Sequence, residues 1–427
     1  MLKRIICVVM VCVLTILQPI DGGVNCAAQS SLKFRQQCIN TGKVFLEKYY
    51  KAINTQTTID LPNYDIETDI AEYLECKKEI MVNRLKSSNC KVTYSKVEVE
   101  YDDYEISNDE AAVIYNVLIQ RKYDGSDEIA ESMRQVRLNF QKDNATTEIV
   151  DCFEYSEFDI NVLEMLNNKQ ANFEERNSYN RYHINFGEKV KKILNEMKVQ
   201  EKEFYDKYDK TSNSYKKRIL ESSKVTLPSI TNKSDAIPLS ISSSARSKIV
   251  TYAKDNCSKT TPKSGNSSYA SYYDFHQLSG SYDCTNFASH CMLAGGAKEN
   301  SKSWYYNSLS DRTPSWSGVN PFYDFIISNS GNGPQAEERS LAYGCPSSYV
   351  NWSNGDIVQI RYSGYAYPGY GHTTIITGSY SANSYSYTPR VTSRTGANWY
   401  TKNEVLTVQY PISDDIINYR LLHLKDI

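Results

Sequence analysis

Histidine is scarce in this chain of 427 residues, and its scarcity restricts the chemistry that the sequence supports. Only five histidines occur, and no histidines or cysteines have the Cys-x-x-Cys or His-x-x-x-His spacing of a metal site. A phosphate-binding loop, a dinucleotide-binding fingerprint and a Gly-x-Ser-x-Gly elbow are also missing. The sequence therefore predicts neither a metal nor another cofactor.

A strong net charge and long apolar runs are likewise missing. The 48 basic and 50 acidic residues nearly balance, which argues against nucleic acid as a partner. The apolar run from Ile5 to Leu17, after Lys3-Arg4, is shorter than the ~20 residues that span a bilayer. It is typical of a secretory signal peptide, which we place at residues 1–28. We expect a secreted, extracellular protein, associated with the cell wall or free, without an integral membrane segment after signal removal.

Eight of the 11 cysteines follow the predicted signal, four in each half of the chain. Export permits disulfides, so a bridge among the first four is expected, although the sequence does not assign its connectivity. In the second half, Cys257 and Cys345 are the candidate pair. Cys284 is expected to stay free for the reason given below.

The pattern of helices and strands divides the chain into two domains. Helical patterns between residues 44 and 85 precede four alternating, strand-like segments between 92 and 153. This order predicts a smaller α+β domain, cystatin-like or NTF2-like, over residues 29–165. Residues 166–240 read as a helical segment and a Ser/Thr-rich linker, and residues 241–427 form the second domain.

A cysteine opens a predicted helix in the second domain. Asp283 is a candidate N-cap, apolar residues follow Cys284 at helical spacing, and Gly295-Gly296 ends the run. Unpaired N–H groups and the helix dipole at this position favour a reactive thiolate. On the same helix, Cys291 is predicted to lie in the core and His290 to be exposed to solvent.

A histidine that could serve as base follows 88 residues later. His372 opens a β-branched run that reads as a strand, and the segment from Ile357 reads as its partner in a hairpin. The loop between them is rich in tyrosine, and Tyr365, Tyr367 and Tyr370 are expected to line or cover a cleft. Helix cysteine first and sheet histidine later is the order found in papain-like folds.

Residues 241 to about 425 resemble the putative amidase domain family of Gram-positive bacteria, a relative of the NlpC-type and CHAP papain-like cysteine hydrolases. The resemblance implies a papain-like α+β domain, in which the nucleophile helix packs on an antiparallel sheet. It also implies Cys284 as nucleophile and His372 as general base. Six ordered segments carry it: Ser244–Ala253, Asp283–Ser289 with Gly295-Gly296, Ser303–Tyr306, Ser315–Val319, Gly355–Val358 and Gly371-His372.

The third member of the catalytic group departs from the family pattern. Relatives tend to carry a histidine where this chain has Arg394, and arginine cannot accept a hydrogen bond from imidazole. Thr392, Ser393, a backbone carbonyl or a water remain as candidates for orienting the histidine.

Three residues near the pair are candidates for the oxyanion site or for binding substrate. The backbone N–H of Cys284 is the expected first oxyanion donor, and Tyr282 is a candidate second donor. In the related peptidases the tyrosine and aspartate before the cysteine grip a free amine, a role open to Tyr282 and Asp283. Asp283 could instead be only a helix cap. Tyr370 is the third candidate, as a residue of the cleft.

The sequence as a whole predicts an exported cysteine amidase or peptidase. Its expected substrate is a peptidoglycan stem peptide or another cell-wall amide, hydrolysed through a thioester. One alternative is a weak or inactive module that binds the cell wall or a protein, which the Arg394 departure motivates. A second is a transglutaminase-like acyl transferase, which would use the same pair.

Overall fold

The structure is a computed structural model, and it describes most of the chain. The predicted signal up to residue 21 lies outside the described residues, as do Tyr282, Tyr365 and Tyr367. The described residues are 22–59, 61–107, 109–143, 146–155, 159, 162, 188–222, 241–259, 283–308, 310–345, 350–362, 370–383, 386–396, 399–410 and 417–427.

The N-terminal half consists of long helices and an antiparallel meander, as predicted. In strand β2 every second residue is buried over most of its length, which matches the alternation of apolar residues in the sequence. The elements are α2 (Gly22–Thr55), η1 (Leu61–Tyr64), α3 (Thr68–Ser87), β1 (Val92–Ser107), β2 (Glu110–Tyr123), β3 (Ile129–Asp143), β4 (Thr146–Tyr155) and α5 (Glu188–Ser222).

The C-terminal half begins with helices and ends with strands. The predicted hairpin is confirmed, because β6 and β7 pair in antiparallel fashion from Ile360 and His372 to Ile357 and Ile375. The elements are α6 (Ser243–Asn256), α7 (Cys284–Gly295), α8 (Pro314–Ser317), α9 (Val319–Ser328), β5 (Gln335–Arg339), β6 (Ile357–Tyr362), β7 (His372–Asn383), β8 (Ser386–Gly396), β9 (Trp399–Val405), α10 (Leu406–Gln409) and β10 (Ile417–Asp426).

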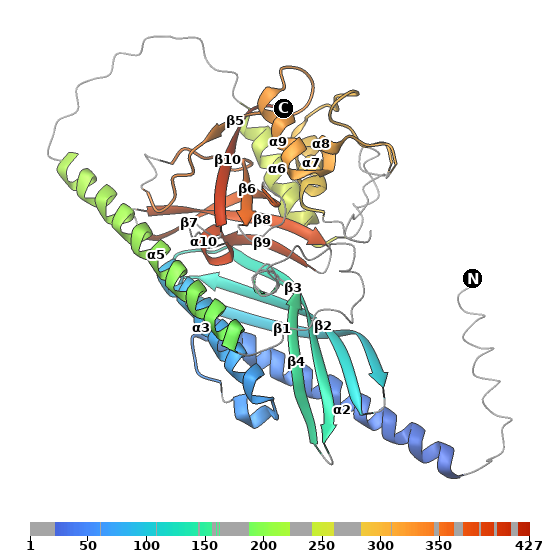
Figure 1. Ribbon diagram of the computed structural model, residues 1–427. Helices are drawn as coiled ribbons and strands as arrows, with labels where there is room; N and C mark the ends of the chain where they lie inside the picture. Colours follow the sequence, from blue (N-terminus) through green and yellow to red (C-terminus); the bar gives the residue numbers. More distant parts are fainter. Residues whose placement is uncertain are drawn as a thin grey trace, which may run out of the picture.

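One sheet runs through both halves (Figure 1). Its strand order is β1-β2-β3-β9-β8-β7-β6-β10-β5, and β4 pairs with β3 beside this path. The two halves join where β3 pairs with β9 at three positions. The first of these pairs is Glu131 with Lys402, and the last is Met133 with Tyr400. The mixed helical and antiparallel architecture confirms the α+β class, and the predicted domain boundaries stay a prediction.

Two apolar cores lie on the sheet. The first combines residues of α2, α3 and the meander with Val391, Leu406 and Tyr410 from the C-terminal half. The second is formed by α6, α7 and α9 against other residues of the C-terminal strands, such as Ile375. In Figure 1, α6 to α9 gather at the C-terminal strands, whereas α3 and α5 run side by side along the N-terminal half. Apart from α10, which contributes Leu406 to the first core, the helices of the two cores thus come from different halves of the chain.

The disulfide predictions are wrong for the described residues. All eight cysteines after the predicted signal are free thiols. Cys257 packs in the core with α7, whereas Cys345 forms an isolated β-bridge with Tyr387, so different elements hold the two candidate partners apart. Within the described residues, no helix is both long enough and apolar enough to cross a bilayer.

Candidate active site

Cys284 is the first residue of α7, as the sequence predicted. The helix ends at Gly295, and Gly296 adopts the left-handed conformation (φ 117°) that glycine accepts at low cost. The N–H groups of Gly296 and Ala297 return to carbonyls of the last turn. At the other end, Asp283 makes no capping hydrogen bond with its side chain, so the predicted side-chain cap is not formed.

The carboxylate of Asp283 is instead paired with Arg394. Arg394 Nε lies 2.6 Å from Asp283 Oδ2, and both side chains are fully buried. Asn286 donates to the other carboxylate oxygen at 2.9 Å, and Arg394 also donates to the carbonyl of Cys257. The arginine that departs from the family pattern therefore holds the start of the nucleophile helix against β8.

The cysteine lies where β7 and β8 separate. The pairing of these two strands ends at Ile375 and Thr392, so residues 372–374, the first three of β7, do not pair with β8. The start of α7 bridges the opening: the N–H of Asp283 donates to the carbonyl of Thr395, and the hydroxyl of Thr285 lies 3.0 Å from that of Thr373. This contact places Cys284 and His372 in adjacent segments, since each is the immediate neighbour of one of the two threonines.

Burial raises the pKa of the Cys284 thiol to about 11. Hydrogen bonds from the backbone of Thr373 and from Thr285 oppose the shift, but the loss of water around the sulfur is the larger effect. The thiol is therefore protonated at neutral pH. The sequence led us to expect a thiolate at Cys284 because the residue begins a helix. That expectation is wrong for this structure, because the start of the helix is buried and burial favours the neutral thiol.

His372 is the first residue of β7 and is also buried, with 6% of its surface exposed. Burial lowers its pKa to about 4, so the imidazole is neutral at pH 7. Its Nε2 lies 3.1 Å from the hydroxyl of Tyr410. Among the described residues no hydrogen bond joins His372 to Cys284, and the pair stays a prediction in which Nδ1 would face the thiol.

A tyrosine makes the contact with His372 that was expected from Thr392 or Ser393. Tyr410 Oη contacts His372 directly and lies 3.0 Å from Ser393 Oγ. The predicted candidate Ser393 is therefore linked to His372 through the hydroxyl of Tyr410. The hydroxyl of Thr392 instead contacts Thr377 at 2.9 Å. Sequence reasoning missed Tyr410 because it follows a four-residue helix 38 positions later and belongs to no local pattern.

Tyr370 is held in place by contacts with Asn320 and Arg420. Its N–H donates to Asn320 Oδ1 at 3.3 Å, and the guanidinium of Arg420 lies 4.0 Å from its ring centre, with the ring of Tyr323 on Arg420 as well. Burial raises the pKa of Tyr370. Its role in binding substrate stays a prediction, and Tyr282 lies outside the described residues.

Two tryptophans of the family-like segments bind the nucleophile helix. Trp316 Nε1 donates to Asn286 Oδ1 at 2.6 Å, and Trp304 Nε1 donates to Ser289 Oγ at 3.1 Å. Asn286 and Ser289 therefore have hydrogen-bond partners although the helix is buried on nearly every side. This role gives a physical reason for tryptophan at both positions.

The environment of His290 corrects another prediction. The ring was expected to face solvent, but it is buried and packs edge-on against Trp316 at 5.2 Å. Burial lowers its pKa to about 3, which keeps it neutral. The prediction failed because α8 covers the face of α7 that helical spacing assigned to solvent. Cys291 is fully buried in the core, as predicted.

Asp356 supports the sheet beneath the site. Its buried carboxylate accepts from Arg246 of α6 at 2.6 Å and from the backbone of Leu424 at 3.1 Å. His423 Nδ1 lies 2.7 Å from the other oxygen. Asp356 thereby ties α6, β6 and β10 together, which explains the Gly-Asp segment in structural terms.

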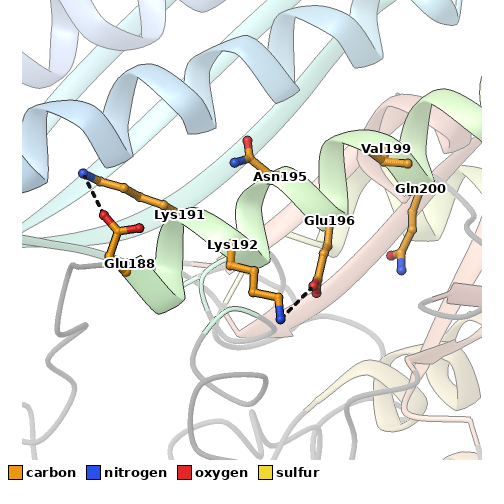
Figure 2. Close-up of a pocket in the computed structure, with 7 residues that line it drawn as sticks. All are labelled: Glu188, Lys191, Lys192, Asn195, Glu196, Val199 and Gln200. Atoms are coloured by element: carbon orange, nitrogen blue, oxygen red, sulfur yellow. Dashed lines mark ion pairs between the residues drawn. The ribbon is translucent and has the colours of Figure 1, made fainter.

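A surface hollow of about 490 Å³ lies elsewhere, along α5 (Figure 2). Two ion pairs run along it, Lys191 with Glu188 and Lys192 with Glu196. All of its lining residues belong to α5, so neither Cys284 nor His372 contributes. In the part of the chain that the structure describes, no three His, Cys, Asp or Glu residues are grouped to hold a metal ion.

Comparison with known proteins gives one match. Residues 243–415 match a family model described as a putative amidase domain. The matched segment includes α7, strands β6 to β9 and α10, and hence Cys284, His372 and Tyr410. No curated protein and no solved structure matches the chain. The match supports a putative amidase family for residues 243–415 and indicates an amide hydrolase in general.

Proposed function

We propose that this chain is an exported cysteine amidase or peptidase that hydrolyses an amide of the cell wall, with peptidoglycan stem peptides as the favoured substrate. Cys284 is the nucleophile and His372 the general base. The observation that carries the proposal is the position of Cys284 at the opening between β7 and β8, where the hydroxyl of its neighbour Thr285 contacts that of Thr373, the neighbour of His372. Export rests on the apolar segment within residues 1–28.

The resting pair is uncharged, which determines how the reaction begins. With the pKa of the thiol near 11 and that of the imidazole near 4, neither group is ionised at pH 7. The proton therefore moves from Sγ to Nδ1 of His372 as the sulfur forms its bond to the substrate carbonyl carbon. Nε2 keeps its hydrogen bond to Tyr410 during this step, and the contact between Nδ1 and Sγ tightens when substrate binds.

The intermediate then collapses in the usual order of a thioester mechanism. The backbone N–H of Cys284, which at the first position of α7 has no acceptor within the helix, stabilises the oxyanion. The imidazolium returns its proton to the leaving amine as the C–N bond breaks. Water, deprotonated by the imidazole, cleaves the thioester, releases the carboxylic acid and restores the thiol.

We also propose that residues 241–427 adopt a papain-like fold related to NlpC-type and CHAP hydrolases. The support is the chain order, with a helix-borne cysteine packed on an antiparallel sheet whose later strand begins with histidine. The Arg394 departure does not favour an inactive module, because Arg394 is bound to Asp283 and Tyr410 contacts the histidine instead.

The test is mass spectrometry of purified peptidoglycan after incubation with the mature protein. The wild type should create new amino and carboxyl ends, and Cys284→Ala should create none. Cys291→Ala is the matched control, since it removes a buried thiol from the same helix without touching the site, and it should retain activity. Unchanged muropeptides with the wild type would favour a binding module.

The same experiment separates hydrolysis from acyl transfer. Adding a small primary amine to the reaction offers an alternative to water as acceptor. Products that carry the amine in place of a new carboxyl end would identify the transglutaminase-like reaction, whereas carboxyl ends alone identify a hydrolase.

A further inference from the structure

Tyr410 determines where the imidazole of His372 lies. Its hydroxyl is 3.1 Å from Nε2, its ring centre is 5.7 Å from that of the histidine, and its side chain is 1% exposed. The hydroxyl also lies 3.0 Å from Ser393 Oγ. When Nε2 carries the hydrogen, it donates to Tyr410 and the tyrosine hydroxyl donates to Ser393. This tautomer leaves Nδ1 with the lone pair that a general base needs.

The position of Tyr410 is set by α10, a single helical turn. The N–H of Tyr410 donates to the carbonyl of Leu406 at 2.8 Å and so ends this helix. A turn of four residues has too few internal hydrogen bonds to hold its own conformation. Its stability must come from packing, and Leu406 and Thr407 are both fully buried.

The N-terminal half supplies the polar contacts of α10. Ser88, which ends α3, places its hydroxyl 2.9 Å from that of Thr407. Tyr205 of α5 donates its hydroxyl to the carbonyl of Thr407 at 2.8 Å. These two contacts join residues that are 319 and 202 positions apart in the sequence.

The two helices that reach Thr407 are themselves joined. Arg84 of α3 donates through Nε to both carboxylate oxygens of Glu201 in α5, at 3.1 and 3.0 Å, and both side chains are almost fully buried. The pair lies one turn before Ser88 on α3 and one turn before Tyr205 on α5. It therefore fixes the positions of the Ser88 and Tyr205 hydroxyls relative to each other, beside α10.

We infer that the N-terminal half of this chain is a positioning element for the active site, in which α3 and α5 hold Thr407 of α10 so that Tyr410 orients His372. The inference rests on the proposed function for the role of His372. Tyr410 contacts the imidazole and acts through it, so it is a positioning residue. The cell-wall reaction would then depend on residues far outside the family-like segment.

The central test uses the full-length chain with Tyr410→Phe, which keeps the ring and removes only the hydroxyl. Nitrogen NMR of the imidazoles reads the tautomer directly, and with five histidines in the chain a His372→Gln spectrum assigns the signal. We expect the Nε2–H tautomer of His372 to lose population. The kcat should fall roughly 10- to 100-fold with a smaller change in KM, because part of the 10²–10⁴-fold contribution of a general base is lost.

A second variant tests the contribution of the N-terminal half. Thr407→Val with Tyr205→Phe removes the two hydroxyls that join α10 to α3 and α5, and the change in the His372 signal should have the same direction and a smaller size. Tyr380→Phe is the matched control. The hydroxyl of Tyr380 in β7 donates to the carbonyl of Asn89 in the N-terminal half at 3.1 Å. The substitution breaks this hydrogen bond and leaves the contacts of α10 unchanged. Its His372 signal should equal that of the wild type.

The NMR and kinetic readouts separate two kinds of failure. Unchanged imidazole signals in folded Tyr410→Phe, or in the double variant if Tyr410→Phe does not fold, would overturn the inference even where the wild type cleaves peptidoglycan. A wild type without hydrolytic activity whose His372 tautomer still responds to both variants would overturn the proposed function and leave the positioning role supported.

Discussion

The two members of the predicted pair are held by different parts of the molecule and by different kinds of interaction. Cys284 is placed by α7, and α7 is held within the C-terminal half by the buried ion pair between Asp283 and Arg394. His372 is placed through Tyr410, and the polar contacts of α10 come from the N-terminal half. The helix that carries Cys284 is attached by an ion pair within the amidase-like segment. The helix before Tyr410 is attached by hydrogen bonds of neutral hydroxyl groups to residues that are distant in the sequence.

This difference predicts different consequences of mutation on the two sides. Removing one member of a buried ion pair leaves an uncompensated charge, which costs about 3–5 kcal/mol of stability. Removing one neutral hydrogen bond costs about 1 kcal/mol. Loss of the ion pair on the cysteine side should therefore destabilise the protein strongly, and loss of a hydroxyl on the histidine side should leave it folded with a misplaced imidazole.

The largest effect is expected from Arg394→Met. It leaves the carboxylate of Asp283 buried without its cation, so the free energy of unfolding should fall by about 3–5 kcal/mol in urea titrations. Arg390→Met is the matched control, because Arg390 is equally buried on the same strand but its partner Glu128 is half exposed. Water can solvate the carboxylate of Glu128, so the control should lose clearly less. Equal losses of unfolding free energy would show that the ion pair of Arg394 with Asp283 stabilises the protein no more than that of Arg390 with Glu128.

The next effect concerns acid pH and the two buried histidines. The pKa is lowered from 6.5 to about 4 for His372 and to about 3 for His290, so the unfolded chain takes up protons first. Their stabilisation is present above pH 6.5 and is lost as the pH falls, by about 1.4 kcal/mol per pH unit for each ring. The loss from His372 should level off near pH 4 and that from His290 near pH 3.

Urea titrations between pH 7 and pH 3 measure this dependence. His290→Gln should remove the part of the slope that belongs to the cysteine side, and His372→Gln the part that belongs to the histidine side. A variant with the wild-type slope would mean that its histidine is already charged in the folded protein.

The reactivity of the thiol gives a third comparison. With a pKa near 11, Cys284 should react with iodoacetamide at pH 8 roughly 100-fold more slowly than the same cysteine in urea-unfolded protein, since only the thiolate is alkylated. The rate, followed by mass spectrometry of the peptide that contains residue 284, should still rise above pH 9. A plateau below pH 8 would instead indicate a thiolate paired with an imidazolium.

The smallest expected effect lies at the seam between the halves. Tyr400 of β9 donates its hydroxyl to Glu131 of β3 at 2.7 Å, beside the three residue pairs that join the strands. Tyr400→Phe should lower the free energy of unfolding by about 1 kcal/mol. Tyr305→Phe, which removes an exposed hydroxyl bonded to Asp311, should change it little. If both variants behave alike, the hydroxyl at the seam contributes no more than a surface contact.

Sequence patterns predicted those features that depend on neighbouring residues. The bounds of α7 followed from Cys284 and the two glycines after it, and the β6–β7 hairpin followed from its β-branched runs. The prediction for His290 failed because helical spacing identifies the more apolar face and not whether a second layer covers the other face. Here α8 and its tryptophan provide that layer.

The interactions of the site were predictable only in part. The sequence singled out Cys284 and His372 as the reactive pair and noted Arg394 as a departure, but it assigned no partner to the arginine. Arg394 binds a residue 111 positions earlier, and Tyr410 contacts a histidine 38 positions earlier. Such contacts depend on how strands align and helices dock, which residue spacing along the chain does not encode.

By itself, the sequence determined which residue types the site has, where the nucleophile helix begins and ends, and that the fold is a mixture of helices and antiparallel strands. Only the tertiary structure decided that one sheet joins both halves, that the side chains of Cys284 and His372 are buried and uncharged, and that a tyrosine contacts the histidine. The physical reason is that local structure follows from hydrogen bonds and apolar periodicity over a few residues. Burial, pKa and the choice of distant partners follow instead from how complete layers pack against each other.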